Sequence, residues 1–235
     1  MSSILYFWGN DPARDADYHT FVIQGLDTSR PDDPPRLKDV FRFKSADYLD
    51  ILNWLFVKPF KSMPPTKFYT DATRDPTWAE ILTKKLGVNV VNSFKYTQDS
   101  KLKLKVTARQ YLQAGYTFPD ADILESQQKI TAEKAHWIRE IKAESLREQM
   151  KPTSGDKISF DHGGKHNDLN AGFELSLQAV YDYQKGNFGQ HGNEIEFGGG
   201  GEDYGDSQEN TVVNSLMNRF SNYSNDVNVK VTYGS

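Results

Sequence analysis

The stretch KISFDHGGKHNDLNAGFELSLQAV, residues 157–180, combines a short strand, a glycine turn and the start of an amphipathic helix. Residues 157–162 alternate enough to form a strand, and Gly163 and Gly164 end it. After the turn, one apolar stripe repeats at helical spacing and is formed by Leu169, Phe173, Leu177 and Val180. Asp168 therefore falls in the first helical turn, where the helix dipole favours an ionised carboxylate. A carboxylate held there suits a divalent cation, provided that other residues supply further ligands.

The composition limits the classes of protein that this chain can represent. Its 235 residues are enough for one sizeable domain with appendages, or for two small domains. The absence of cysteine excludes disulfides, thiolate zinc sites and cysteine nucleophiles. No apolar run reaches the length of a membrane span and no secretory signal precedes the first strand, so we expect neither a membrane partner nor secretion. The formal charge of -4 argues neither for nor against nucleic acid, because lysines can cluster while acids gather around cations.

The order of strands and helices predicts the fold class. Apolar and alternating runs predict strands over 3–9, 18–26, 37–43, 66–70, 88–94 and 157–162. Helical patterns occupy 45–57, 77–87, 100–114 and 121–150, followed by the helix that opens at Asp168. We expect the first three strands to form an antiparallel meander, with the charged third strand at an edge, and the later strands to be parallel because helices join them. The predicted class is α/β, a mixed sheet flanked by helices.

The composition shifts near the end of the chain and suggests three segments. Residues 1–184 carry the predicted strands and helices and form one domain. Residues 185–210 are rich in Gly, Asn, Asp and Glu and have few apolar side chains, which is typical of a flexible linker. Residues 211–235 regain some apolar pattern and form a C-terminal tail or appendage.

Three aspartates occupy comparable places in this order. Asp11 follows the first strand, Asp71 follows the strand over 66–70, and Asp168 opens the late helix. Ligand crevices in open α/β sheets lie beyond the strand ends, so neighbouring first and fourth strands would bring Asp11 and Asp71 together. Three carboxylates at such a crevice suit two Mg²⁺ or Mn²⁺ ions about 4 Å apart, which support phosphodiester cleavage. The spacing alone is equally compatible with ordinary strand-end and helix-cap aspartates.

Other polar residues near these aspartates are secondary candidates. Asp15 and Asp75 lie close in sequence to Asp11 and Asp71 and either add a carboxylate to the site or serve as solvated turn residues. Lys165 precedes Asp168 and is a candidate for a phosphate contact or for balancing charge. Three lysines near the start of the helix over 100–114 are candidate DNA-phosphate contacts, namely Lys101, Lys103 and Lys105. Residues two apart do not share a helix face, so only one or two of them can point at DNA.

Three pieces of the chain resemble the nuclease domain of the large terminase subunit of tailed phages, which has an RNase H-like fold. The first piece is YFWGNDPARDADYHTFVI, at residues 6–23. The second is KFYTDATRDPTWAEILTKKLGVNVVNSFKYTQDSKLKLKVTARQYLQAGYTFPD, at residues 67–120. The third is GGKHNDLNAGFELSLQAV, at residues 163–180. They follow the family's order of acidic motifs and together span roughly the first 180 residues.

The resemblance implies a role for individual residues. Asp11, Asp71 and Asp168 match the family's metal ligands, and His166 matches a histidine of the closing motif. The chain departs from the family at Asn167, where the closing motif has the first of two acids. We take the second acid as the ligand, so Asp168 remains in the predicted set.

The resemblance also implies an activity and its partners. It predicts a Mg²⁺- or Mn²⁺-dependent endonuclease that cuts double-stranded DNA with little sequence preference during viral genome packaging, in the cytoplasm of an infected host cell. Implied partners are a terminase ATPase domain or subunit, the portal and the small terminase. No GxxxxGK[ST] motif occurs, so the ATPase function is not expected in this chain. The alternatives are another RNase H-like nuclease, of the junction-resolvase or integrase type, and a non-catalytic docking module of a packaging complex.

Overall fold

The computed structural model describes residues 3–12, 18–44, 47–73, 76–147, 149–152, 158–161 and 168–188. Chain contacts divide the protein into two units, the first comprising Met1–Lys151 and Ile158–Gly192, the second Pro152–Lys157 and Asn193–Ser235. Apart from Pro152, the second unit lies outside the described residues, as do the predicted tail over 211–235 and most of the predicted linker. The last described helix runs to Phe188, four residues beyond the expected domain end at 184.

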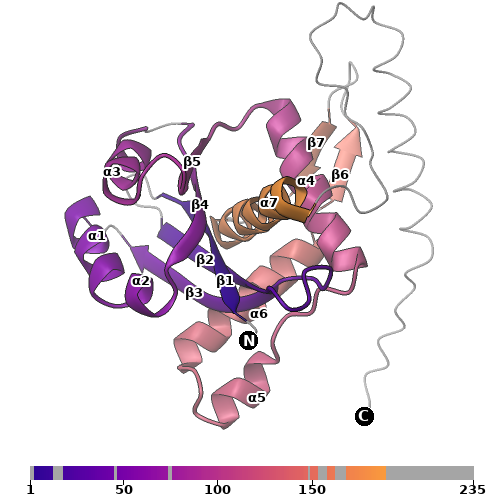
Figure 1. Ribbon diagram of the computed structural model, residues 1–235. Helices are drawn as coiled ribbons and strands as arrows, with labels where there is room; N and C mark the ends of the chain where they lie inside the picture. The colour runs from indigo at the N-terminus through magenta and orange to yellow at the C-terminus, as the bar shows by residue number, and fades with distance from the viewer. Residues whose placement is uncertain are drawn as a thin grey trace, which may run out of the picture. The chain divides into compact units, whose positions relative to one another are not determined.

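Five strands form a mixed sheet in the order β3-β2-β1-β4-β5 (Figure 1). They are β1 (Ile4–Asp11), β2 (Tyr18–Asp27), β3 (Arg36–Lys44), β4 (Pro65–Asp71) and β5 (Val91–Phe94). β1 pairs antiparallel with β2 and β2 with β3, whereas β4 pairs parallel with both β1 and β5. The predicted meander, its third strand at an edge and the parallel strands after it are therefore confirmed. The order also makes β1 and β4 neighbours, as the proposed acid pair requires.

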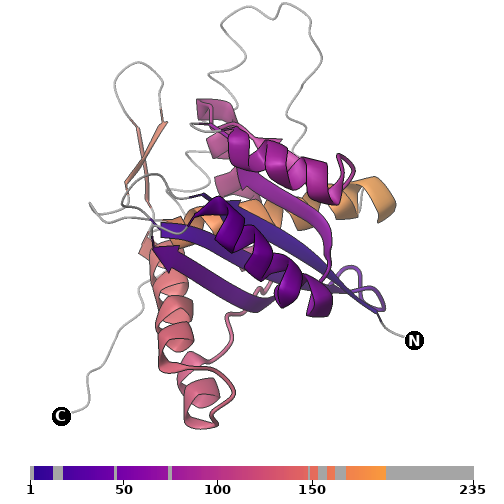
Figure 2. The same ribbon diagram turned by 90° about the vertical axis from the view of Figure 1, so that its left-hand side faces the viewer.

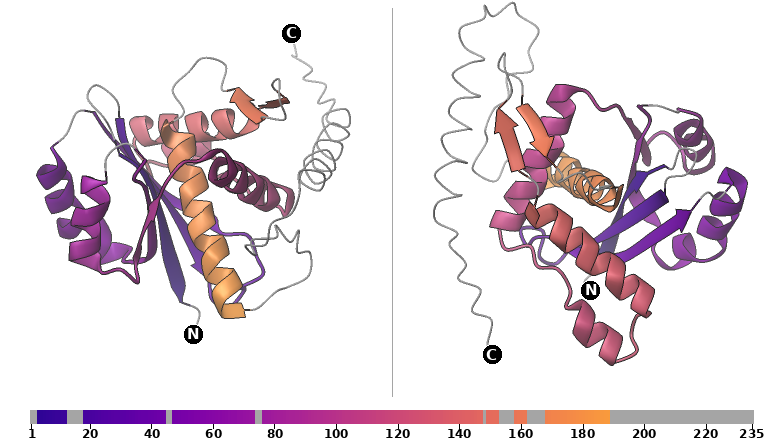
Figure 3. Two further views of the ribbon diagram at one scale, coloured as in Figure 1. Left: turned by 90° about the horizontal axis from the view of Figure 1, so that it is seen from above. Right: turned by 180° about the vertical axis from the view of Figure 1, so that it is seen from behind.

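Helices cover both faces of this sheet (Figure 3). One face carries α1 (Tyr48–Val57), α2 (Pro59–Ser62) and α3 (Thr77–Leu86), and the other carries α4 (Gln98–Gln113), α5 (Ala121–Ser126), α6 (Ala132–Arg147) and α7 (Asp168–Phe188). Each face has its own core: Trp8 and Phe68 belong to the α1–α3 side, and Phe7 and Tyr69 belong to the α7 side. Because successive strand residues point to opposite faces, these side chains fix the face of their neighbours as well. None of the helices in the described part of the chain is long and apolar enough to cross a bilayer.

Helix α7 lies directly on β1, where two glycines meet. A Cβ added at Gly9 would lie 1.9 Å from the carbonyl oxygen of Gly172 and 2.3 Å from the backbone nitrogen of Ser176. The backbones of strand and helix therefore touch, which only a residue without a Cβ permits at position 9. A buried hydrogen bond of 3.1 Å from Gln24 Nε2 to Ser176 Oγ ties the helix to β2 beside this contact.

Two sequence predictions about the second half of the chain were wrong. The late strand, β7 (Ile158–Asp161), pairs with β6 (Gln149–Pro152) in a separate two-stranded sheet instead of joining the parallel strands. Alternation identifies a strand but carries no information about its partner, which is why the sheet was misassigned. The single helix expected over 121–150 is two helices, α5 and α6, separated by a turn in which Gln128 has a φ of 56°.

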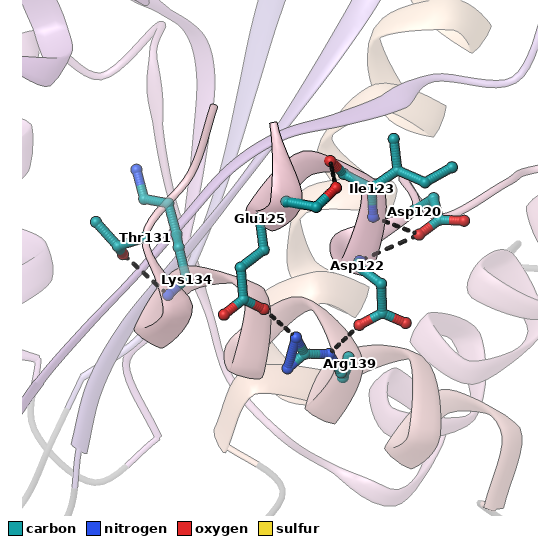
Figure 4. Close-up of polar contacts among 8 residues, drawn as sticks. Asp120, Asp122, Ile123, Glu125, Thr131, Lys134 and Arg139 are labelled. Atoms are coloured by element: carbon teal, nitrogen blue, oxygen red, sulfur yellow. Dashed lines mark hydrogen bonds and ion pairs between the residues drawn. The ribbon is translucent and has the colours of Figure 1, made fainter. Parts of the chain in front are cut away.

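Polar contacts hold α6 against α5 and against the edge of the sheet. Arg139 on α6 donates from Nε to Asp122 Oδ1 at 3.0 Å and from Nη2 to Glu125 on α5 (Figure 4). Lys134 Nζ lies 2.7 Å from Asp39 Oδ1 on β3, and α6 crosses near the edge of the sheet that β3 forms (Figure 2). The exposed Arg139 pairs contribute little stability individually. The partly buried pair between Lys134 and Asp39 has a geometric consequence, because it holds α6, with its acids, beside the side chains of β3.

We expect His19 to make the protein sensitive to acid. The ring is fully buried against Phe21, Trp78 and Tyr48, and neither ring nitrogen forms a hydrogen bond with the described residues. Burial lowers the pKa of His19 from 6.5 to about 3. Between these pKa values the unfolded chain binds more protons at His19 than the folded chain does. The free energy of unfolding therefore has its full value, as far as His19 is concerned, above pH 6.5, and it falls by about 1.4 kcal/mol per pH unit as the pH drops towards 3. Denaturant unfolding of wild type and His19→Phe from pH 7 to pH 4 measures this, and parallel curves would contradict it.

Candidate active site

Asp11 and Asp71 end neighbouring parallel strands and lie on the same face of the sheet. The register pairs Asn10 with Thr70, so the aspartates that follow them are at the same level. Phe7 and Tyr69 belong to the core on the α7 side, and Asp11 and Asp71 stand an even number of residues after them. Because strand side chains alternate, both aspartates face the α7 side. Both are half-buried at the carboxyl edge of the parallel strands, which is where open α/β sheets bind ligands.

Asp168 reaches the same end of that face from the first turn of α7. Thr20 on β2 pairs with Asp11, and its Oγ1 donates a hydrogen bond of 3.0 Å to the backbone carbonyl of Asp168. The close contact between Gly9 and Gly172 sets the height of the helix above the strand. Three elements that are distant in sequence therefore place Asp11, Asp71 and Asp168 at one edge of one face.

An arginine that the sequence analysis missed lies beside Asp168. Arg42 on β3 places Nη2 3.8 Å from Asp168 Oδ2 and Nη1 3.0 Å from Glu140 Oε2 on α6. Its guanidinium carbon lies 3.8 Å from the centroid of the Tyr18 ring, a cation–π contact, and only 13% of its side chain is exposed. The positive charge is thus held in one place between two acids. Nothing in the local pattern of β3 distinguishes Arg42 from an ordinary edge-strand residue.

A fourth carboxylate, also missed, lies near Asp168. Glu144 on α6 has a buried Oε2 that accepts no hydrogen bond from the described residues. Burial, and then the negative charges of Glu140 and Asp168, raise the pKa of Glu144 to about 7, although Asn170 and Arg42 oppose the shift. Among the described residues, the acids Asp168, Glu140 and Glu144 therefore carry more negative charge than Arg42 balances. Such an excess favours binding of a proton or a cation.

The Asp71 carboxylate also takes part in a local turn. Its Oδ1 accepts hydrogen bonds from the backbone nitrogen of Thr73 at 2.8 Å and from Thr73 Oγ1 at 2.5 Å. Thr73 Oγ1 in turn accepts a hydrogen bond of 2.7 Å from the backbone nitrogen of Tyr96. The turn fixes the orientation of the carboxylate at the end of β4.

The donor set fits a divalent cation in kind. Asp11, Asp71 and Asp168 offer carboxylate oxygens, which Mg²⁺ and Mn²⁺ prefer, and no softer ligand lies among them. Within the ranges that the structure describes, no group of three or more His, Cys, Asp or Glu side chains is gathered closely enough to hold an ion. The secondary candidates Asp15, Asp75, Lys165 and His166 lie outside the described residues.

The three candidate lysines of α4 have different surroundings. Lys101 is exposed, with Nζ 5.7 Å from the centroid of the Tyr96 ring. Lys103 is also exposed, and its Nζ lies 3.9 Å from Asp182 Oδ1. Lys105 differs, because its Nζ lies 2.6 Å from Glu174 Oε1 in an ion pair whose side chains are 11% and 4% exposed. Lys105 thus faces α7, so Lys101 and Lys103 are the two that remain accessible to a DNA phosphate.

We expect the Glu144→Gln variant to gain stability relative to wild type as the pH rises. Between pH 4.5 and about 7 the folded state binds the Glu144 proton more tightly than the unfolded state does. The free energy of unfolding of wild type therefore decreases as the pH rises through this range, whereas the glutamine of the variant has no proton to lose. After allowance for solvent screening, the difference should reach about 1–2 kcal/mol by pH 8. Over pH 4.5–6.5 the neutral His19 makes the free energy of unfolding rise with pH, so in wild type it offsets the decrease caused by Glu144. Unfolding of both proteins at pH 4.5 and pH 8 measures it, and a constant difference would refute it.

The mixed sheet with helices on both faces has the RNase H-like α/β fold of terminase nuclease domains. The large terminase nuclease from thermophilic phage G20c is similar with a TM-score of 0.52 and 14% identity, over 75% of this chain and 82% of that one. The Thermus phage P74-26 large terminase nuclease domain is similar with a TM-score of 0.53 and 16% identity, over 78% of this chain and 82% of that one. The nuclease domain of the bacteriophage SPP1 large terminase, crystallised with bound Mn, has a TM-score of 0.48 and 12% identity, over 74% of this chain and 85% of that one.

Comparison of the sequence with protein-family models and with curated proteins gives no match. The similarity to the solved structures therefore confirms the resemblance at the level of the fold.

Proposed function

We propose that this chain is a divalent-metal-dependent endonuclease that cuts double-stranded DNA by a two-metal mechanism. The observation that carries the proposal is that Asp11, Asp71 and Asp168, from two neighbouring parallel strands and one helix, share one edge and one face of the sheet. The three carboxylates are not gathered around one point in the described structure. Side chains that turned towards a common point at this edge would repel one another unless a cation bound between them.

In this proposal the three aspartates hold Mg²⁺ or Mn²⁺ through their carboxylate oxygens. When bound, two such ions activate water for attack on phosphorus and stabilise charge on the leaving oxygen. The protein positions the ligands: Thr20 holds the first turn of α7 in place, and Thr73 orients Asp71. Arg42 is held beside Asp168 and keeps positive charge at the site. Lys101 and Lys103 are exposed on α4 and are the proposed DNA-phosphate contacts among the described lysines named above.

The biological setting that we propose is viral genome packaging in the cytoplasm of an infected host cell. The fold shared with phage terminase nuclease domains supports it. In that setting the partners would be double-stranded DNA, a terminase ATPase domain or subunit, the portal and the small terminase. Lys165 stays a candidate for a phosphate contact or for balancing charge, and His166 is a candidate for orienting a water or contacting the scissile phosphate.

A non-catalytic docking module is the second candidate, and two contacts favour it. Asp71 orients the turn at Thr73, and Asp168 lies beside Arg42, so both acids have roles that need no ion. Another RNase H-like nuclease, of the junction-resolvase or integrase type, would use the same acids but prefer branched DNA or DNA ends over a linear duplex.

Thermal melting with and without Mn²⁺ separates the docking module from a nuclease. If the ion binds the folded site, a concentration one hundred times its Kd stabilises the protein by about 2.7 kcal/mol, which raises the melting temperature by several degrees. We expect this shift for wild type and its loss in Asp11→Asn. A melting temperature that Mn²⁺ leaves unchanged in wild type would favour the docking module.

A further inference from the structure

Asn10 is a fully buried polar residue one position before Asp11, and its amide joins four elements. Its Nδ2 donates to the carbonyl oxygen of Thr20 on β2 at 2.7 Å. Its Oδ1 accepts from Thr70 Oγ1 on β4 at 2.7 Å and from Trp78 Nε1 on α3 at 2.6 Å. Trp78 Nε1 can only donate and the Thr20 carbonyl can only accept, so these two partners determine the orientation of the amide, and the Thr70 hydroxyl then donates to Oδ1.

The hydrogen bond between Asn10 and Thr70 spans the two strands that carry the first two aspartates. Asn10 directly precedes Asp11, Thr70 directly precedes Asp71, and the register pairs Asn10 with Thr70. Because side chains alternate, this hydrogen bond lies on the α3 side of the sheet while the aspartates face the α7 side. A contact on one face therefore ties together the two strand ends from which the carboxylates project on the other face.

The same amide is connected to the third aspartate. Nδ2 of Asn10 holds the carbonyl of Thr20, and Oγ1 of Thr20 holds the carbonyl of Asp168. Within the described part of the chain, these hydrogen bonds connect the Asn10 side chain directly to β4, at the residue before Asp71. They also connect it, through Thr20, to the start of α7 at Asp168.

We propose that Asn10 is a positioning residue that sets the spacing of Asp11, Asp71 and Asp168 from the opposite face of the sheet. The inference rests on the proposed function, because it assigns the spacing to a cation site. A carboxylate at position 10 would lose the donor to Thr20, and an apolar side chain would leave buried donors and acceptors without partners. An amide is the side chain of this size that satisfies both requirements.

Two variants that each remove one donor to the same oxygen test the inference. Thr70→Val removes the hydroxyl beside Asp71, and Trp78→Phe removes the indole N–H on α3, while Oδ1 keeps one donor in each case. The Mn²⁺ affinity of the folded proteins is measured by calorimetric titration, with Thr70→Ser as the variant that retains a hydroxyl. We expect about tenfold weaker binding for Thr70→Val, the magnitude typical of residues that orient metal ligands, and wild-type binding for Trp78→Phe and Thr70→Ser.

The outcomes separate this inference from the proposed function. If wild type binds Mn²⁺ but Thr70→Val binds it equally well, or if Thr70→Val and Trp78→Phe weaken binding to the same extent, Asn10 has only a structural role and the inference is overturned. If wild type binds no Mn²⁺, the proposed function is overturned and the inference with it. Thermal unfolding of each variant without Mn²⁺ identifies any loss of affinity that follows from loss of folded protein alone.

Discussion

Replacing Asp71 with asparagine is expected to reduce metal-dependent cleavage of plasmid DNA by at least about a hundredfold, because it removes a charged cation ligand worth several kcal/mol in the transition state. The fold should be retained, since the asparagine oxygen can still accept the hydrogen bonds that Thr73 donates. The measurement is the initial rate of nicking with Mn²⁺, combined with circular dichroism of the variant.

Asp27 provides a matched control for Asp71. Its Oδ1 accepts hydrogen bonds from the backbone nitrogen of Ser29 at 2.9 Å and from Ser29 Oγ at 2.6 Å, which is the same turn geometry at the opposite end of the sheet. Asp27→Asn should therefore cost as much stability as Asp71→Asn and leave cleavage at the wild-type rate. Equal cleavage by the two variants would remove Asp71 from the site.

The Gly9→Ala variant is expected to be destabilised by about 3 kcal/mol, at the upper end of the usual cost of overpacking. The new Cβ would meet backbone atoms of α7 at 1.9 and 2.3 Å, and backbone cannot rotate away as a side chain can. The helix must therefore move off β1, and Asp168 at its start moves away from Asp11. We expect cleavage to fall along with stability, as measured by denaturant unfolding and by nicking rates at a temperature where the variant is folded.

Two glycines of the same helix are controls for Gly9→Ala. A Cβ at Gly172 would lie 3.2 Å from Val22 Cγ2 and 3.4 Å from Thr20 Oγ1, so a small shift of side chains is sufficient, and the gain in helix propensity of about 1 kcal/mol offsets it. A Cβ at Gly186 meets nothing within 4 Å, and alanine should stabilise the helix there. If Gly9→Ala is no more destabilising than Gly172→Ala, the helix does not rest on β1 as described.

The local pattern of the chain predicted most of the five-stranded sheet but not the separate two-stranded sheet of β6 and β7. Short apolar runs that end in Asp11 and Asp71 indicated strands, and the helices between them implied parallel pairing, so the neighbouring acids followed from connectivity. Pairing of β7 with β6 depends on which strand is nearby in space, and alternation does not encode that.

The residues missed near the site are those whose role depends on distant partners. Arg42 and Glu140 are 98 positions apart in the sequence, and no sequence motif in β3 or α6 predicts that they form an ion pair. Glu144 acquires its raised pKa from burial and from neighbouring acids that only the packing of α6 brings together. Asn10 falls just after the strand expected over 3–9, and nothing in the local pattern indicates that its amide is buried and hydrogen-bonded to β2, β4 and α3. Asp11, Asp71 and Asp168 could be proposed from the sequence because they stand at positions that the strand and helix boundaries define.

Cleavage of supercoiled plasmid in the presence of Mn²⁺, Mg²⁺ or EDTA tests the central claim most directly, with wild type compared with Asp11→Asn and Asp168→Asn. The account predicts nicking and linearisation by wild type with either cation, none with EDTA, and none by either variant under any condition. Cleavage that persists in EDTA, or that both variants retain at the wild-type rate, would contradict the assignment of a cation site to these aspartates.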